Sequence, residues 1–337
     1  MNILVTGAAG FIGSSLAYRA YRDKYNLVLL DNLSYGKKRN LVFEDVNLSE
    51  KLLLCDIRNF AELENVFADN KFDCVLHFAG IAPLPDCQGD ARVAIQVNIE
   101  GTVNILELCR KYGVGKMVFA STSAIYENDS IFPSKEKSHS LPTLIYPNTK
   151  YSAERFCQSY VDSYGISVTC LRFANVYGPH IDYLRKQPPF MGYMLNEILC
   201  DRNPVFYSDG TQKRDYIYID DLIELSMLVT KSDGFECVNV SSNCSYSVNK
   251  LFEIAKKISN KPYLTASFKA SNKIWSNYPS LFSGQFPLLA DIISHEVNKR
   301  TLCDNDYAFK RYGWMPKITI EEGIRKTFNY LADNFER

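Results

Sequence analysis

The sequence lacks the features that would point to a membrane, nucleic-acid or metal protein. No window approaches the ~18 consecutive apolar residues that a membrane-spanning helix needs. Lys and Arg together number 38, as do Asp and Glu, so no net field attracts nucleic acid or a membrane surface. The ten cysteines include no CxxC pair, and the four histidines are scattered, at positions 77, 139, 180 and 295. Without such clusters we expect no metal site.

The cysteines and the start of the chain favour a cytoplasmic protein. Cys74, Cys109 and Cys170 fall in apolar strand or helix patterns, as buried, reduced thiols do. The first residues form an apolar strand, without the basic region and apolar stretch of a signal peptide. A chain of 337 residues is long enough for one large or two modest domains.

Strand and helix patterns alternate over the first half of the chain, which predicts a parallel sheet covered by helices on both faces. The expected strands are 2–6, 26–30, 52–54, 73–78, 116–120 and 167–173. The expected helices between them are 14–21, 61–68, 92–112 and 151–164.

After Gly178 the alternation breaks at a segment rich in proline and aromatic residues, and the elements expected next are a helix near 191–201 and a strand at 205–207. A helix at 220–230 and a strand at 237–240 then return to the first domain, and two further helices begin after Ser247 and Thr319. We therefore predict an α/β protein with a Rossmann-type doubly wound parallel sheet and a smaller α/β substrate domain, the ligand lying between them. The predicted domains are 1–177 plus about 212–243, and about 178–211 plus 244–337.

The first strand runs directly into closely spaced glycines, Gly7, Gly10 and Gly13, and then into a helix. Glycines permit a tight turn and let backbone N–H groups approach a pyrophosphate, while the helix N-terminus adds partial positive charge. The second strand ends at Asp31, whose carboxylate is placed to accept hydrogen bonds from the adenosine ribose. Because that carboxylate would repel a 2′-phosphate, the sequence favours NAD over NADP.

Tyr146 and Lys150 stand four residues apart, a spacing that places a phenol and an ammonium on one helix face. An unperturbed tyrosine titrates near pH ~10, and a neighbouring cation lowers that value. We therefore expect Lys150 to lower the pKa of Tyr146, which would then serve as general base toward a sugar alcohol.

In combination, the motifs of this chain resemble those of extended short-chain dehydrogenase/reductases of the nucleotide-sugar epimerase and dehydratase type. The resemblance runs from residue 1 to about 245, and more loosely to the end. The motifs are GAAGFIG (7–13), DNLSYG (31–36), CDIRN (55–59), HFAG (77–80), VNIEGT (97–102), ASTSAIY (120–126), YxxxK (146–150), LRFANVYGP (171–179) and RDYIYIDD (214–221).

The resemblance implies roles for individual residues. It makes Thr122, Tyr146 and Lys150 the catalytic set, and Asn98 a structural position. It implies cofactor contacts at Gly7, Gly10, Phe11, Ile12, Gly13, Asp31, Asn32, Asp56, Ile57, Phe78, Ala79, Gly80, Tyr146 and Lys150. It implies substrate contacts at Thr122, Asn175, Val205, Arg214 and Thr301, with a nucleotide-diphosphate sugar as the partner.

One absence narrows the reaction. Family members that remove water across C5 and C6 carry a Thr-Asp-Glu series, but here Thr122 is followed by Ser123 and Ala124, which argues against a 4,6-dehydratase. Tyr146 would take the proton of the C4 hydroxyl as hydride leaves C4 for the nicotinamide. If the 4-keto sugar takes hydride back on its other face the enzyme is a C4 epimerase, and if the sugar leaves it is a C4 dehydrogenase or a keto reductase. A non-catalytic, redox-sensing binding protein stays a third alternative.

Departures from the family pattern concern the substrate. The residues after the HFAG motif, Ile81 to Cys87, carry no lysine or arginine, and the segment 275–300 has no clear match to a usual phosphate-binding arginine. Lys299 or Arg300 is a possible substitute. Thr301 falls where a bulky residue would restrict the pocket.

Helices 92–112 and 151–164 carry apolar residues on more than one face. Burial under neighbouring helices is one explanation. The other, implied by the resemblance, is a two-fold homodimer through these helices, with Tyr146 just before the second helix and the active sites facing away.

Overall fold

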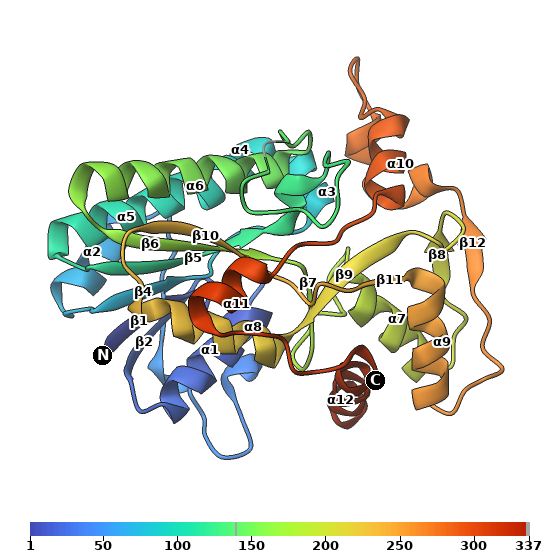
Figure 1. Ribbon diagram of the computed structural model, residues 1–337, viewed down its shortest axis with the longest axis horizontal. Coiled ribbons are helices and arrows are strands. Elements are labelled where there is room, and N and C mark those ends of the chain that lie inside the picture. Colours follow the sequence, from blue (N-terminus) through green and yellow to red (C-terminus); the bar gives the residue numbers. More distant parts are fainter. Residues whose placement is uncertain (139, 335–337) are drawn as a thin grey trace.

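The computed structural model describes residues 1–138 and 140–334, and its centre is a seven-stranded sheet in which every pair of neighbours is parallel (Figure 1). The strand order is β10-β6-β5-β4-β1-β2-β3. In chain order the strands are β1 (Asn2–Thr6), β2 (Asn26–Asp31), β3 (Leu52–Leu54), β4 (Cys74–His77), β5 (Lys116–Thr122), β6 (Ser167–Phe173) and β10 (Phe235–Val240). Six of them repeat the Rossmann order, and β10 extends it. The predicted fold class is thus confirmed.

Helices cover both faces of this sheet, because the strands are apolar on both sides. One face carries α2 (Phe60–Ala68), α5 (Gly101–Tyr112) and α6 (Ile145–Tyr164), and the other α1 (Phe11–Arg22) and α8 (Ile219–Leu228) (Figure 1). Leu106 and Cys157 belong to the core on the first face, and Leu16 and Leu222 to the core on the second.

Two smaller sheets lie beyond the carboxyl ends of the large sheet (Figure 1). One has the order β11-β9-β7, from Ser245–Ser247, Lys213–Tyr218 and Asn175–Tyr177, and the other pairs β12 (Ser267–Lys269) with β8 (Val205–Tyr207). Around them pack α7 (Phe190–Leu199), α9 (Val248–Ile258) and α12 (Ile320–Asp333). Since β9 joins the small sheet while α8 and β10 join the large one, the chain passes between the two parts more than once. The domain boundaries given above stay a prediction.

Several helix ends follow from local sequence. The Ser247 hydroxyl accepts a hydrogen bond from Lys250 N at 3.2 Å, and the Thr319 hydroxyl accepts one from Glu322 N at 3.2 Å, so each caps the helix after it. At the other end, α5 stops at Gly113 in the left-handed region, with φ of 71°.

The sequence missed or misplaced some helices. It did not predict α3 (Leu84–Gly89), α10 (Ala290–Asn298) or α11 (Asp306–Tyr312). The expected helix 92–112 is α4 (Ala91–Ile95), a π-helical turn (Gln96–Glu100) and α5 in direct succession. The placement of Tyr146 before the helix 151–164 is wrong, because α6 already starts at Ile145; proline is tolerated in a first helical turn, and Pro147 lies there.

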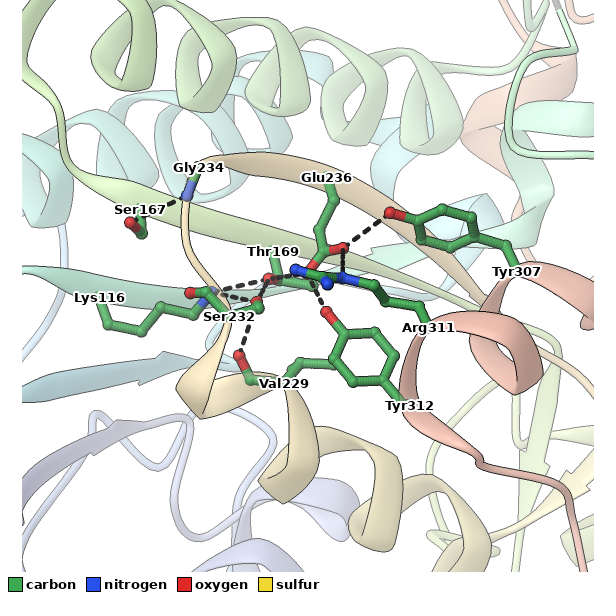
Figure 2. A network of polar contacts seen from close by, with 10 residues as sticks. All are labelled: Lys116, Ser167, Thr169, Val229, Ser232, Gly234, Glu236, Tyr307, Arg311 and Tyr312. Atoms are coloured by element: carbon green, nitrogen blue, oxygen red, sulfur yellow. Dashed lines mark hydrogen bonds and ion pairs between the residues drawn. The ribbon is translucent and has the colours of Figure 1, made fainter.

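A buried polar network lies at the amino ends of β5 and β6 (Figure 2). The Lys116 ammonium donates to the Thr169 hydroxyl and to both the hydroxyl and carbonyl oxygens of Ser232, each at 2.8 Å. Glu236 of β10 accepts hydrogen bonds from the Thr169 hydroxyl at 3.1 Å, from Tyr307 at 3.0 Å and from Tyr312. The two tyrosines belong to or directly end α11, so this network fastens α11 to the edge strand of the sheet.

Candidate active site

The residues assigned to the cofactor gather at the carboxyl ends of β1, β2 and β4. Gly7 follows β1 with φ of 69°, and a Cβ there would lie 2.7 Å from the backbone of Phe78 and Ala79. A Cβ at Gly13 would lie 2.0 Å from the Gly7 carbonyl oxygen, so neither position has room for a side chain. The bare turn leads into the N-terminus of the twelve-residue helix α1, where Gly10, Phe11 and Ile12 lie. This geometry fits the pyrophosphate of a dinucleotide.

Asp31 ends β2 and is held by the backbone. Its two carboxylate oxygens accept hydrogen bonds from Ala9 N at 3.0 Å and Leu33 N at 2.7 Å. Burial raises the pKa of Asp31, and these backbone bonds act in the opposite direction. Each carboxylate oxygen keeps a further acceptor site, which suits a ribose hydroxyl.

Asn32, Asp56 and Ile57 lie beside Asp31. The Asn32 amide donates to Asp56 at 2.7 Å, and Arg58 holds the pKa of Asp56 well below its usual range. Ile57 packs against the start of α5, since a Cβ at Gly101 would lie 2.5 Å from Ile57 Cδ1. The structure therefore brings the predicted adenosine-side residues together.

Tyr146 and Thr122 meet at the end of β5. Thr122 is the last residue of that strand, and Tyr146 lies in the first turn of α6. Burial raises the pKa of Tyr146 to about 12, and a hydrogen bond with the Thr122 hydroxyl opposes that rise. The Thr122 oxygen also accepts a bond from Ala124 N at 3.1 Å, which fixes its position.

Lys150 lies one helical turn further along α6 and is only 5% exposed. Its ammonium sits 4.6 Å from the centre of the Phe119 ring, and a Cβ at Gly80 would lie 3.2 Å from it. Burial lowers the pKa of Lys150 to about 8. Among the described residues its ammonium makes no hydrogen bond, so its donors are available to a ligand.

The expectation that Lys150 lowers the pKa of Tyr146 is wrong for this structure. The groups that lower it are Thr122 and Arg185, and burial outweighs both. The ammonium of Lys150 instead points toward Phe119 and Gly80.

Asn98 ties three parts of the site together from the π-helical turn. Its side-chain oxygen accepts a bond from Ile81 N at 2.8 Å, and its amide nitrogen donates to Ile81 O and the Thr149 hydroxyl, both at 3.0 Å. Asn98 thereby positions the loop after Gly80 and the helix turn between Tyr146 and Lys150, which agrees with the structural role expected for it.

Three of the predicted substrate residues, Asn175, Val205 and Arg214, lie on the smaller sheets, and Thr301 lies in a loop beside them. The Asn175 amide donates to Asp215 O at 2.8 Å, and Thr301 accepts a bond from Asp215 N at 3.1 Å, so both flank Arg214. Arg214 donates to the carbonyl oxygens of Glu296 and Val297 at 2.6 and 3.0 Å. These carbonyls end α10, where a cation is favoured. Val205 lies in β8, opposite Ser267 of β12.

Sequence reasoning missed Arg185, Tyr35 and Asp86. Arg185 lies in the loop after β7, and its charge lowers the pKa of Tyr146. The Arg185 side chain donates to Gln187 O at 2.7 Å. Tyr35 lies inside the DNLSYG motif and Asp86 in the segment after HFAG that departs from the family pattern, whereas Arg185 lies outside the motifs.

A cavity of about 1230 Å³ borders α1, and Phe11 and Tyr35 are among the residues that line it. Phe43, His180 and Tyr330 line it, whereas Thr122, Tyr146 and Lys150 do not. We place the active site by its residues and not by this cavity.

In residues 1–138 and 140–334, no three His, Cys, Asp or Glu side chains are grouped as a metal site would require, and His139 lies outside those ranges. None of the helices in those ranges has the length and apolar character to cross a membrane.

Comparison with known proteins decides the family. The model of the NAD dependent epimerase/dehydratase family matches residues 3–241. The chain belongs to the NAD-dependent epimerase/dehydratase family. Its cofactor is accordingly NAD, and the bare glycine turn and Asp31 fit that dinucleotide.

Members of the family with different names are similar over nearly the whole chain. The UDP-glucuronate 4-epimerase of Thermodesulfobacterium geofontis is 30% identical, over 99% of this chain and 97% of that protein. The dTDP-D-glucose 4,6-dehydratase of Mus musculus is 30% identical, over 99% and 89%. The crystal structure of UDP-glucose 4-epimerase from Thermotoga maritima with UDP-glucose has a TM-score of 0.87 and 29% identity, and the match covers 100% of both chains.

Proposed function

We propose that this protein is an NAD-dependent epimerase that inverts C4 of a uridine-diphosphate sugar through a transient 4-keto sugar. The observation that carries the proposal is the meeting of Tyr146, Thr122 and Lys150 at the carboxyl edge of the sheet, beside the glycine turn. We infer uridine diphosphate as the nucleotide because two of the relatives above are named for UDP-sugars.

The catalytic groups divide the work. Bound NAD supplies the hydride acceptor and donor for C4. Thr122 holds the C4 hydroxyl toward Tyr146, which takes its proton on oxidation and returns a proton on reduction. Lys150 offers three donors beside Gly80. Since the free phenol has a pKa of about 12, it carries its proton at neutral pH, and ligand binding must lower that value before Tyr146 acts as a base.

A dehydratase is disfavoured although several relatives bear that name. Elimination of water needs an acid and a base beside the threonine, and here Ser123 and Ala124 follow Thr122. Neither side chain can protonate a leaving hydroxide.

The test is a product analysis with purified protein and NAD. UDP-glucose and UDP-glucuronate are incubated separately, with chromatography of the sugar products and absorbance of NADH as readouts. We expect a C4 epimer of one substrate without accumulation of NADH. Stoichiometric NADH with a released keto sugar would show a net dehydrogenase instead, and a dehydrated sugar would show a dehydratase. Thr122→Ala is the matched low-activity control.

We further propose a homodimer through α5 and α6. Of the apolar residues on these helices, Ile105, Leu106 and Leu108 are buried within the chain, so intrachain packing explains part of the pattern. Phe156 and Tyr164 remain 42% and 56% exposed on α6, and a two-fold contact would cover them.

Sedimentation tests the dimer directly. Phe156→Glu should shift the protein toward monomer at micromolar concentration, because a buried charge without a partner is costly. Leu289→Glu, at an exposed apolar position away from these helices, is the control and should leave the mass unchanged. A wild-type protein that sediments only as monomer would refute the interface.

A further inference from the structure

A single carboxylate joins three distant segments beside the active site. Asp86 of α3 accepts a hydrogen bond from the Tyr35 hydroxyl at 2.8 Å on one oxygen and from the Tyr278 hydroxyl at 2.7 Å on the other. Hydrogen bonds to an ionised acceptor are among the strong ones in proteins. We call these three residues the Asp86 clasp.

The strand order shows what the clasp crosses. Tyr35 lies in the loop after β2, and α3 follows β4, while β1 lies between β4 and β2 in the sheet. A link from Tyr35 to Asp86 therefore spans the end of β1, where the glycine turn binds the dinucleotide pyrophosphate.

The Tyr35 side of the clasp is fixed to that turn. Lys37 N and the Asn40 amide both donate to Ala9 O at 2.9 Å. A Cβ at Gly36 would lie 2.8 Å from the Asp31 carboxylate. Movement of this loop would accordingly disturb the residues that hold the adenosine side of the cofactor.

The Tyr278 side is anchored in a small apolar core of its own. Tyr278 is 6% exposed and packs in one cluster with Leu144, Trp275, Leu281 and Ile293, and Leu84 of α3 packs against it. Leu144 directly precedes α6, two residues before Tyr146. The divergent segment 274–293 thus rests on both α3 and the start of the catalytic helix.

Two cations stabilise this arrangement from the loop after β7. The Lys186 ammonium lies 3.8 Å from the centre of the Tyr278 ring. Arg185 interacts electrostatically with Asp86, Tyr35 and Tyr278. The phenols keep their protons and remain donors, since burial and Asp86 both raise the pKa of Tyr35.

We propose that the Asp86 clasp closes over bound NAD and slows its release, so that the cofactor stays in place between turnovers. The proposal rests on the function proposed above, because an epimerase regenerates its cofactor in each cycle and gains from keeping it. It assigns a positioning role to Tyr35, Asp86 and Tyr278, which act through the segments that they join. Such closure over a ligand is a common use of loops at active sites.

The experiment measures cofactor release and needs no substrate. Wild-type protein and the variants Tyr35→Phe, Tyr278→Phe and Tyr35→Phe/Tyr278→Phe are loaded with NADH, and an excess of NAD then displaces it while NADH fluorescence is followed. Each substitution removes one hydrogen bond to a charged acceptor, worth about a tenfold change. We expect each single variant to release NADH about tenfold faster, and the double variant to release it faster than either single variant.

Tyr263→Phe is the matched control, because Tyr263 donates a similar bond to Asp201 at 2.6 Å on the exposed surface away from the cleft. It should release NADH at the wild-type rate. Thermal unfolding with and without NADH identifies any variant that fails to fold, and Asp86→Asn then replaces it. A double variant that is folded and releases NADH as slowly as the wild type would overturn the clasp, as would equal acceleration by the control. Failure of the epimerase proposal would appear only in the product analysis, so the two results are separable.

Discussion

A buried lysine lies near each end of strand β5, and the two lysines differ in their hydrogen-bond partners. Lys116 at the amino end is 7% exposed and Lys150 beside the carboxyl end is 5% exposed, and burial lowers the pKa of both to about 8. Lys116 donates to three oxygens at 2.8 Å (Figure 2). In the described residues, the ammonium of Lys150 has only the Phe119 ring as a close partner.

Two equally buried lysines therefore have two different roles. The amino-end lysine has its donors satisfied by the protein and contributes to the attachment of β10 and α11. The carboxyl-end lysine keeps its donors for a ligand. A buried polar group with no protein partner costs free energy, and in this fold that cost falls at the edge of the sheet where ligands bind.

The largest expected effect lies at the carboxyl end and concerns activity alone. Tyr146→Phe should lower turnover at least ~10²-fold, the lower range for loss of a general acid–base group, while NAD binding and the melting temperature stay close to wild type. Steady-state kinetics with the substrate found above, together with thermal unfolding, measures both. Near-normal turnover of this variant would show that Tyr146 is not the general acid–base group.

Exchange of each lysine for methionine tests the comparison itself. Lys116→Met leaves the Thr169 hydroxyl and both Ser232 oxygens without this donor and should lower the free energy of unfolding by about 1–3 kcal/mol, with turnover per folded molecule unchanged. Lys150→Met breaks no protein hydrogen bond, so it should lower turnover without such a loss. Denaturant unfolding and kinetics on both variants provide the readout. Similar losses of stability in the two variants would show that the two lysines do not differ in their roles.

Asp31, which also lies at the carboxyl edge of the sheet, predicts different affinities for NAD and NADP. Its carboxylate is predicted to face the ribose edge, so NADP should bind at least ~10-fold more weakly than NAD, about 1.4 kcal/mol. Calorimetric titration of cofactor-free protein measures both affinities. Equal or tighter binding of NADP would show that the carboxylate does not face the ribose.

The smallest expected effect is a pH dependence of the stability that comes from Lys116, at the amino end of β5. Folding lowers the pKa of Lys116 from its ordinary 10.5 to about 8, so between these values the unfolded chain binds more protons and stability from this group rises with pH. From pH ~8 to pH ~9 the gain should be about 1 kcal/mol. Lys116→Met should lack it, so the stability difference between the two proteins widens over that interval. A constant difference would contradict the shift.

The sequence predicted the strands well because they are apolar runs, and two of them have clear ends, β1 at Gly7 and β2 at Asp31. β1, β3 and β6 have the expected bounds, and the glycine turn and Asp31 lie together as expected. The sequence did not predict the short or irregular elements. α3 has six residues and contains Pro85, and α10 lies in the divergent segment, so neither has a periodic pattern that stands out.

Parts of the site depend on contacts that no local pattern encodes. The pKa of Tyr146 is set by burial, Thr122 and Arg185, and the last of these comes from a loop without a motif. The Asp86 clasp joins residues 51 and 192 positions apart. The roles of Asn175, Arg214, Val205 and Thr301 stay predictions, since their present contacts are with the protein.

The position of Asn98 has a consequence for subunit association. Its amide holds Ile81 and Thr149, and it lies on the helical run that continues into α5, one of the two helices of the proposed dimer. A force that shifts α5 against α6 would therefore reach the turn between Tyr146 and Lys150. By reciprocity, a ligand that orders this turn should also tighten the proposed dimer, and the coupling free energy between ligand binding and subunit association is the same whichever of the two is measured.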